Sequence, residues 1–196
     1  MLGAYDALLN HEPDKNPKML HRIEHFTLTV PEQIQEAKRL NLGVTHLMGH
    51  VYYWGAAFRD YVLGCPRAKR IDPVAEDAAH DLVFSFHSDS PVSDVYPLLY
   101  VQTAVTRQLY QSKEVLGPAQ CVDLETALKG VTINPARQCM LDDITGSLEV
   151  GKSADFVLLE KDPRQVAPDE ISNIQILGTW LAGKRQWGAG KRQFRL

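Results

Sequence analysis

The chain has 196 residues, of which 44% are hydrophobic and 23% are charged, and its net charge is −3. These values are ordinary for a soluble globular protein with one domain, or with one domain and a small appendage. The weak negative charge gives no reason to expect a nucleic-acid partner or a membrane partner, and no run of 18 apolar residues predicts a transmembrane helix. The basic tail at 191–195 is interpreted as a solvated chain end.

The amino terminus and the cysteines indicate a cytoplasmic protein. The amino terminus has no basic region before an apolar core, so it does not resemble a signal peptide. Cys65, Cys121 and Cys139 lie far apart and form no Cys-x-x-Cys pair. Three scattered cysteines are typical of buried free thiols in a reducing compartment.

The first 145 residues alternate between helical and strand patterns. Residues 1–10 have the apolar spacing of an amphipathic helix, and 10–18 form a polar loop. Strands are expected at 20–26, 42–47 and 82–86. Helices are expected at 31–40, within 66–79, at 97–109, at 123–130 with Asp123 as N-cap, and in a short helix capped by Asn134 with Pro135 in its first position. This alternation predicts parallel strands joined by crossover helices.

The pattern changes after Gly146. An apolar strand is expected at 154–159, and strands at 174–181 and 184–187 are expected to form a hairpin about Ala182 and Gly183. We therefore divide the chain into an α/β part at 1–145 and a small β segment at 146–196.

Two strand tips carry the residues most suited to chemistry. In a barrel of parallel strands, catalytic groups lie at the carboxyl ends of the strands. His25 ends the first predicted strand, whereas His21 lies four residues earlier, roughly 13 Å away if the strand is extended. His25 is either a metal ligand or a polar residue at a strand end. Asp89 either binds metal, or takes a proton from a metal-bound water, or forms an Asx turn or helix cap before Pro91.

Three further residues could border the same site. His87 lies two residues before Asp89, on the same face and roughly 6.6 Å away, so it could line the same pocket. His50 and Trp54 belong to an aromatic loop at 49–55, which either encloses a substrate or covers the barrel rim. His46 and His80 are expected to be surface or packing residues.

Other enzyme classes lack support in this sequence. No phosphate-binding glycine loop, dinucleotide fingerprint or Gly-x-Ser-x-Gly elbow is present. No motif therefore supports interpreting the chain as a kinase, a dehydrogenase or an α/β-hydrolase.

Six motifs together give the chain a family resemblance. It resembles the C-terminal portion of the metal-dependent amidohydrolase superfamily, in the branch that includes N-substituted formamide deformylases. The motifs are HRIEH (21–25), GHVYYWG (49–55), FHSDSPV (86–92), PLLYVQTAVTR (97–107), ETALKGVTINPA (125–136) and GSLEVGKSADFVLLEKDP (146–163).

The resemblance implies an α/β fold, namely the C-terminal part of a (β/α)8 TIM-type barrel followed by a small β-sandwich segment. It implies that His25 and Asp89 bind metal, with Asp89 also the catalytic group that transfers a proton. His50 and Trp54 match a loop near the substrate. The implied activity is hydrolysis of a C–N bond in a small amide-type substrate, using a divalent metal that is usually zinc.

The sequence also departs from the family pattern, because several of the family's metal-binding motifs have no counterpart in it. The sequence has no counterpart of the family's His-x-His in the first strand, of its fourth-strand ligand, or of its fifth-strand histidine. A zinc site needs three or four protein ligands, and two are expected here. We therefore expect an incomplete catalytic unit that is inactive alone and requires a complementary N-terminal half or a second copy. The alternative is a non-catalytic binding or structural remnant. A self-sufficient hydrolase, with His50 or His87 as an extra ligand, is the least favoured hypothesis.

Overall fold

The structure, a computed structural model, describes residues 2–11 and 20–188. Most of the loop predicted at 10–18 lies outside the described residues, and so does the basic tail at 191–195. The helix predicted at the amino terminus is α1, Leu2–His11.

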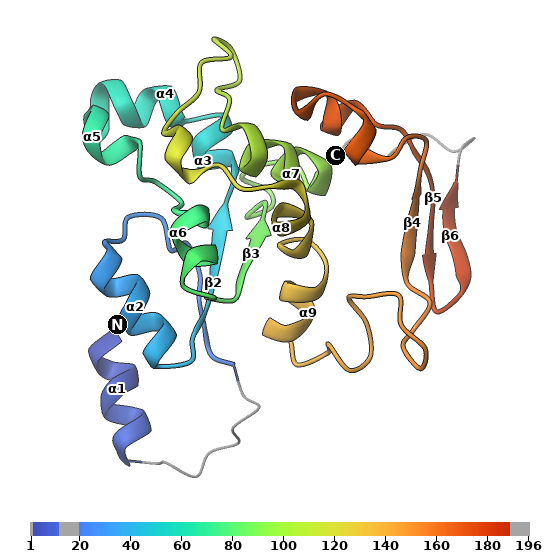
Figure 1. The fold of residues 1–196 in the computed structure, drawn as a ribbon, viewed down its shortest axis with the longest axis horizontal. Helices are drawn as coiled ribbons and strands as arrows, with labels where there is room; N and C mark the ends of the chain where they lie inside the picture. Colours follow the sequence, from blue (N-terminus) through green and yellow to red (C-terminus); the bar gives the residue numbers. More distant parts are fainter. Residues whose placement is uncertain (1, 12–19, 189–196) are drawn as a thin grey trace.

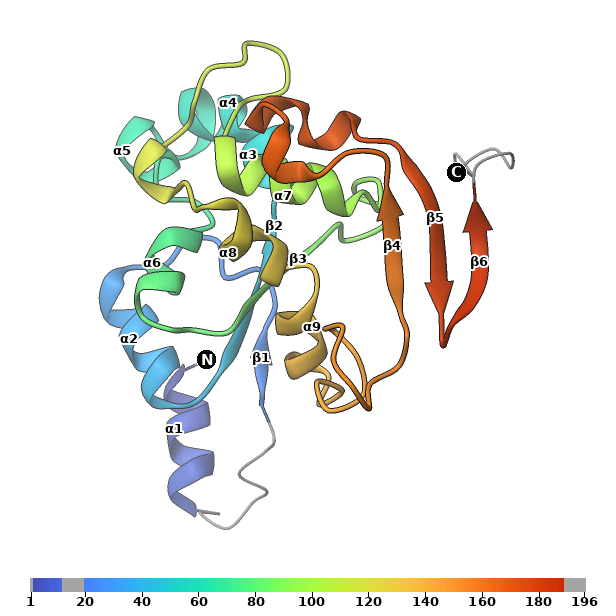
Figure 2. The ribbon, with the colours of Figure 1, turned by 45° about the vertical axis from the view of Figure 1, so that its right-hand side comes forward.

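A short parallel sheet forms the centre of the α/β part. Its strands are β1 (Arg22–Ile23), β2 (Gly43–Leu47) and β3 (Phe84–His87), in the order β1-β2-β3. Both pairings are parallel, which confirms the predicted parallel strands. Figures 1 and 2 show helices on both sides of this sheet. The first strand is shorter than the predicted 20–26, because only two of its residues pair with β2.

The central strand β2 is buried along its whole length, as expected for a parallel strand covered on both faces. Its side chains alternate between two environments. His46 contacts Asp72 and Asp77 in the helical layer, whereas Thr45 faces a pocket on the other side of the sheet.

Between β1 and β3 the chain is mostly helical. Helix α2 (Pro31–Arg39) begins with proline in its first turn and buries Ile34 and Ala37 against the core, close to the prediction. Helices α5 (Cys65–Ala68) and α6 (Val74–Ala79) lie in the region where a loop and a helix were expected.

The aromatic segment at 49–55 is not a loop, so that prediction was wrong. It forms α3 (Gly49–Tyr52) and α4 (Gly55–Ala57), which continue into a π-helical turn at Phe58–Val62. Val51 and Gly55 are buried there, and short helical turns satisfy the backbone groups that burial removes from water.

Four helical elements lie between β3 and the C-terminal sheet: α7 (Pro97–Thr106), a 3-10 turn at Pro118–Gln120, α8 (Leu124–Lys129) and α9 (Ile133–Gln138). The predicted cap of α8 is confirmed, since the Thr126 amide donates to Asp123 Oδ1 at 2.9 Å. The predicted start of α9 was wrong, because its cap is Thr132 and Asn134 is a buried residue inside the helix. Pro135 is tolerated in the first turn, where amide groups have no partner within the helix.

The end of the chain forms a separate antiparallel sheet of β4 (Phe156–Leu159), β5 (Ile176–Leu181) and β6 (Lys184–Gly188). Figures 1 and 2 both show it standing to one side of the parallel sheet. The predicted hairpin is confirmed, with Ala182 and Gly183 in left-handed conformations at φ 48° and 73°. The β-sandwich and the boundary at 145 stay predictions.

Two 3-10 turns, Pro163–Gln165 and Pro168–Asn173, join β4 to β5. The second docks on α7, where the Ser172 amide donates to Gln102 Oε1 at 2.8 Å. No helix in the described ranges is both long and apolar enough to cross a bilayer.

Candidate metal centre

The backbone turns in the same way just after β1 and just after β3. His25 follows β1 by two residues with φ 56°, and Asp89 follows β3 by two residues with φ 53°. Left-handed backbone at residues other than glycine is uncommon and is concentrated at functional sites. Hydrogen bonds hold both turns, since the His25 amide donates to Thr45 Oγ1 at 3.2 Å and the Val92 amide donates to the Asp89 carbonyl at 2.8 Å.

These turns bring three potential metal ligands together. His25 Nε2 lies 3.6 Å from Asp89 Oδ2, and the rings of His25 and His87 are 4.6 Å apart and nearly perpendicular. The three side chains offer ligand atoms that all lie within 4.8 Å of one another. His25 and Asp89 therefore lie at the same end of the sheet and face a common space, as the sequence predicted.

The three groups open into a pocket of about 340 Å³, a size that suits a small ligand. Sequence reasoning missed four of its lining residues. A signal was available, because alternate positions of parallel strands share one face and polar residues are unusual in buried strands. The complete lining is Arg22, Glu24, His25, Thr45, Ser85, His87 and Asp89.

Glu24 brings a negative charge to this pocket. Burial disfavours the charge, but hydrogen bonds from Thr45 Oγ1 and from Arg22 Nε (2.6 Å) outweigh it and hold the pKa of Glu24 below its ordinary value. The carboxylate is therefore ionised and held in place by two partners.

His87 is the least satisfied group of the pocket. Its Nε2 is buried and has no hydrogen-bond partner among the described residues. Burial lowers the pKa of His87 and the neighbouring His25 adds to this, while the carboxylates of Glu24 and Asp89 oppose it, so the net effect favours the neutral imidazole. A neutral imidazole nitrogen is a metal ligand, and a buried polar atom without a partner costs roughly 1–3 kcal/mol. The residues present therefore fit a bound cation.

His50 and Trp54 lie one layer away from the pocket. The His50 ring is 5.8 Å from the His25 ring, and Trp54 lies edge-on to His50 at 6.2 Å. Neither residue lines the pocket itself. Their predicted contact with substrate stays a prediction.

A buried charge network lies behind the centre. His46 Nδ1 lies 3.2 Å from Asp72 Oδ1 and its Nε2 lies 2.6 Å from Asp77 Oδ2, and all three side chains are wholly buried. Burial lowers the pKa of His46, but the two carboxylates outweigh it and raise that pKa to about 9. The packing role predicted for His46 therefore includes a charge, which the sequence spacing did not reveal.

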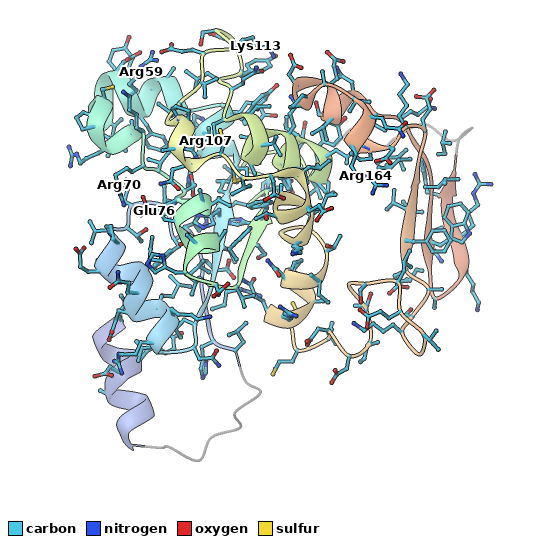
Figure 3. The ribbon with its side chains drawn as sticks, viewed as in Figure 1. Arg59, Arg70, Glu76, Arg107, Lys113 and Arg164 are labelled. Carbon is cyan, nitrogen blue, oxygen red and sulfur yellow. The ribbon has the colours of Figure 1, made fainter. Side chains whose placement is uncertain are left out.

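Arg107, the residue directly after α7, supports the same network (Figure 3). Its guanidinium donates to the carbonyls of Leu116 (2.7 Å), Ile71 (2.9 Å) and Asp72 (3.2 Å). It is fully buried, and burial lowers its pKa to about 10. This side chain fixes the backbone that presents Asp72 to the two histidines.

The sequence model described as the amidohydrolase family matches residues 1–185. The chain belongs to the amidohydrolase family. Over 183 residues it is 28% identical to the N-substituted formamide deformylase of Arthrobacter pascens, a match that covers 93% of this chain and 33% of that enzyme. This chain therefore spans about a third of the length of that deformylase.

Solved structures show the same fold. A metal-dependent hydrolase from Pyrococcus horikoshii is similar with a TM-score of 0.66 and 25% identity, covering 85% of this chain and 33% of the other. An adenosine deaminase from Xanthomonas campestris, solved with bound zinc, has a TM-score of 0.64 and 22% identity, covering 92% and 39%. The second likeness concerns the fold alone.

Proposed function

We propose that this chain supplies one side of the active site of a zinc-dependent hydrolase that cleaves C–N bonds of small amide-type or formamide-type substrates. The observation that carries the proposal is the position of His25 and Asp89, whose side-chain atoms lie 3.6 Å apart at the carboxyl ends of two parallel strands. Membership of the amidohydrolase family and the similarity to the formamide deformylase support this reaction class.

Each residue has a distinct role in this proposal. His25 and Asp89 hold the metal ion, which supplies Lewis-acid activation of water and of the substrate carbonyl. The Asp89 carboxylate also accepts a proton from the attacking water and passes it to the leaving nitrogen. Water adds to the carbonyl carbon, the C–N bond breaks, and the products are an acid and an amine. His50 and Trp54 border the substrate on the α3–α4 side.

We propose further that the chain is an incomplete catalytic unit. The His25 and Asp89 side chains are 39% and 47% exposed, more open than a water-excluding active site requires. The parallel sheet has three strands in the described ranges, whereas a complete barrel has eight. A complementary N-terminal half, or a second copy of the chain, would cover the exposed side of the pocket.

The test is turnover of N-substituted formamides and of N-acyl amines with added zinc. The chain alone is expected to show no appreciable hydrolysis. Mixing it with a second polypeptide that carries the His-x-His strand and the fifth-strand histidine is expected to give zinc-dependent activity that Asp89→Asn abolishes.

Two outcomes would contradict the proposal. A complex that assembles and binds zinc, yet hydrolyses none of these substrates, would favour the non-catalytic alternative. Turnover by the lone chain that disappears in both His25→Ala and Asp89→Ala would show a self-sufficient hydrolase. His80→Ala is the matched control, since His80 lies at the end of α6 and does not line the pocket.

A further inference from the structure

We propose that His87 is the third protein ligand of this centre, so that His25, His87 and Asp89 bind a divalent transition-metal ion such as zinc without a residue from another barrel strand. This inference rests on the proposed function and changes one of its parts. The sequence placed His87 in the lining of the pocket and gave two expected metal ligands, with His87 as an extra ligand only in the least favoured hypothesis. With three ligands of its own, the isolated chain can bind the metal ion without a complementary half.

The geometry needs little adjustment to hold an ion. Nitrogen and oxygen ligands lie about 2.1 Å from zinc, so two ligands of a tetrahedral site are about 3.4 Å apart. His25 Nε2 and Asp89 Oδ2 are already 3.6 Å apart, and all three ligand atoms lie within 4.8 Å of one another. Small rotations of the exposed His25 and Asp89 side chains close the remaining gap, and β3 keeps His87 in place.

The unpaired nitrogen of His87 gives an independent reason. Its Nε2 is shielded from water and has no protein partner in the described part of the chain. Buried polar groups are nearly always satisfied, and an orphan suggests a missing ion or water. His87 lines the pocket together with Ser85, and its ring lies 4.6 Å from the His25 ring, so the unsatisfied side chain belongs to the same cluster as His25 and Asp89.

The donor set selects the class of ion. Two imidazole nitrogens and one carboxylate oxygen suit zinc, and they suit magnesium and calcium poorly because those ions prefer oxygen ligands. Three protein ligands leave the fourth position of a tetrahedral ion free, which is the arrangement of catalytic zinc sites. Glu24 adds a nearby negative charge that favours a cation.

Direct ligation differs measurably from a supporting role. Loss of an outer partner of a metal ligand typically costs 10–100-fold in metal affinity. We expect His87→Ala to weaken zinc binding by more than about 100-fold, as His25→Ala and Asp89→Asn do. His80→Ala removes a histidine whose Nδ1 lies 3.0 Å from the Glu76 carbonyl, and it should leave the affinity unchanged.

The experiment is a titration of the full chain and these variants with zinc, followed by calorimetry, and with cobalt(II), followed by visible absorption. Circular dichroism establishes that each variant is folded. One zinc ion per chain is expected, and the cobalt spectrum should be that of a four-coordinate ion. A loss smaller than tenfold in folded His87→Ala would overturn the inference.

A second measurement needs no substitution at the site. The unmutated chain is labelled with ¹⁵N-histidine and loaded with ¹¹³Cd, and nitrogen–cadmium coupling is recorded by NMR. Coupling is expected at His25 and His87 and at no other histidine. Coupling at His25 without His87, or at neither residue, would overturn the inference.

The outcomes separate this inference from the proposed function. Three-ligand metal binding with no hydrolysis in the assembled protein would leave His87 as a ligand and reject the enzyme. Zinc-dependent hydrolysis that persists in a His87→Ala protein with unchanged zinc affinity would leave the enzyme and reject His87 as a ligand.

Discussion

The Oδ2 atom of the buried Asp72 lies 3.3 Å from Nδ1 of His50. Its other oxygen lies 3.2 Å from Nδ1 of His46, so one carboxylate joins the interior of the helical layer to the ring that packs against His25. The same Nδ1 atom of His50 also lies 3.2 Å from Thr27 Oγ1. The charge of Asp72 and the tautomer of His46 therefore affect His50, which packs against the proposed metal ligand His25.

Asp72→Asn should disturb both histidines at once. An amide offers one acceptor and one donor group, so one of the two imidazoles would face an NH₂ group. We expect a loss of roughly 3–5 kcal/mol in the free energy of unfolding, as for a broken buried ion pair, together with a changed tautomer of His50. Urea unfolding and imidazole ¹⁵N shifts measure the two effects.

The exposed Asp169 in the second 3-10 turn offers the control, because Asp169→Asn removes a carboxylate in a solvated place. Asp169→Asn should leave the free energy of unfolding and the ¹⁵N shifts of His50 unchanged. An Asp72→Asn protein with normal stability and unchanged His50 shifts would show that the carboxylate does not hold these rings.

Stability should depend on pH through His46. Its pKa is raised from 6.5 to about 9 in the folded state, because the effect of the two carboxylates exceeds that of burial. A raised pKa stabilises the folded state fully below pH 6.5, and the contribution is lost as pH rises through 9. The free energy of unfolding should therefore fall between pH 6.5 and 9. A His46→Gln protein should lose this part of the slope, and an unchanged slope would contradict the assignment.

Arg107→Lys should destabilise the protein although it keeps the charge. The guanidinium serves three carbonyls, and an ammonium group on a different stem cannot reach all of them. Each buried carbonyl left unpaired costs roughly 1–3 kcal/mol, so a total loss of about 2–4 kcal/mol is expected in chemical unfolding. Arg164→Lys, at the exposed arginine labelled in Figure 3, should leave the free energy of unfolding unchanged. Equal behaviour of the two variants would contradict the proposed role of Arg107.

Zinc should stabilise the folded chain by mass action. At a free zinc concentration 100 times the dissociation constant, the gain in unfolding free energy is about 2.7 kcal/mol. Magnesium at the same concentration should have no effect, since it prefers oxygen ligands. Thermal unfolding with and without each ion measures this. A zinc effect that survives in Asp89→Asn would place the ion somewhere else.

The sequence predicted the parts of the fold that depend on local patterns. The apolar run at 42–47, the helix that starts at Pro31, the Asp123 cap and the Ala182–Gly183 turn were all confirmed. The helical turns at 49–62 were missed, because burial of Val51 and Gly55 depends on contacts distant in sequence. The start of α9 was misplaced for a related reason, since Asn134 is buried and cannot cap.

The site was predicted only in part. Strand-tip positions and family motifs pointed to His25 and Asp89, and the structure brings them together. Strand spacing placed His87 in the same pocket, as observed, but its ligand atom lies within 4.8 Å of that of Asp89 because the chain turns at Asp89, and an extended strand does not predict that turn. The network of His46, Asp72 and Asp77 joins a strand to residues 26 and 31 positions away, and no short motif indicates it.

The most direct test of the metal centre is anomalous X-ray scattering at the zinc edge, from crystals of this chain grown with zinc. The structure predicts one strong peak within about 2.3 Å of His25 Nε2, of a carboxylate oxygen of Asp89 and of a ring nitrogen of His87. No peak between these residues at saturating zinc, or zinc bound only elsewhere on the chain, would contradict the account.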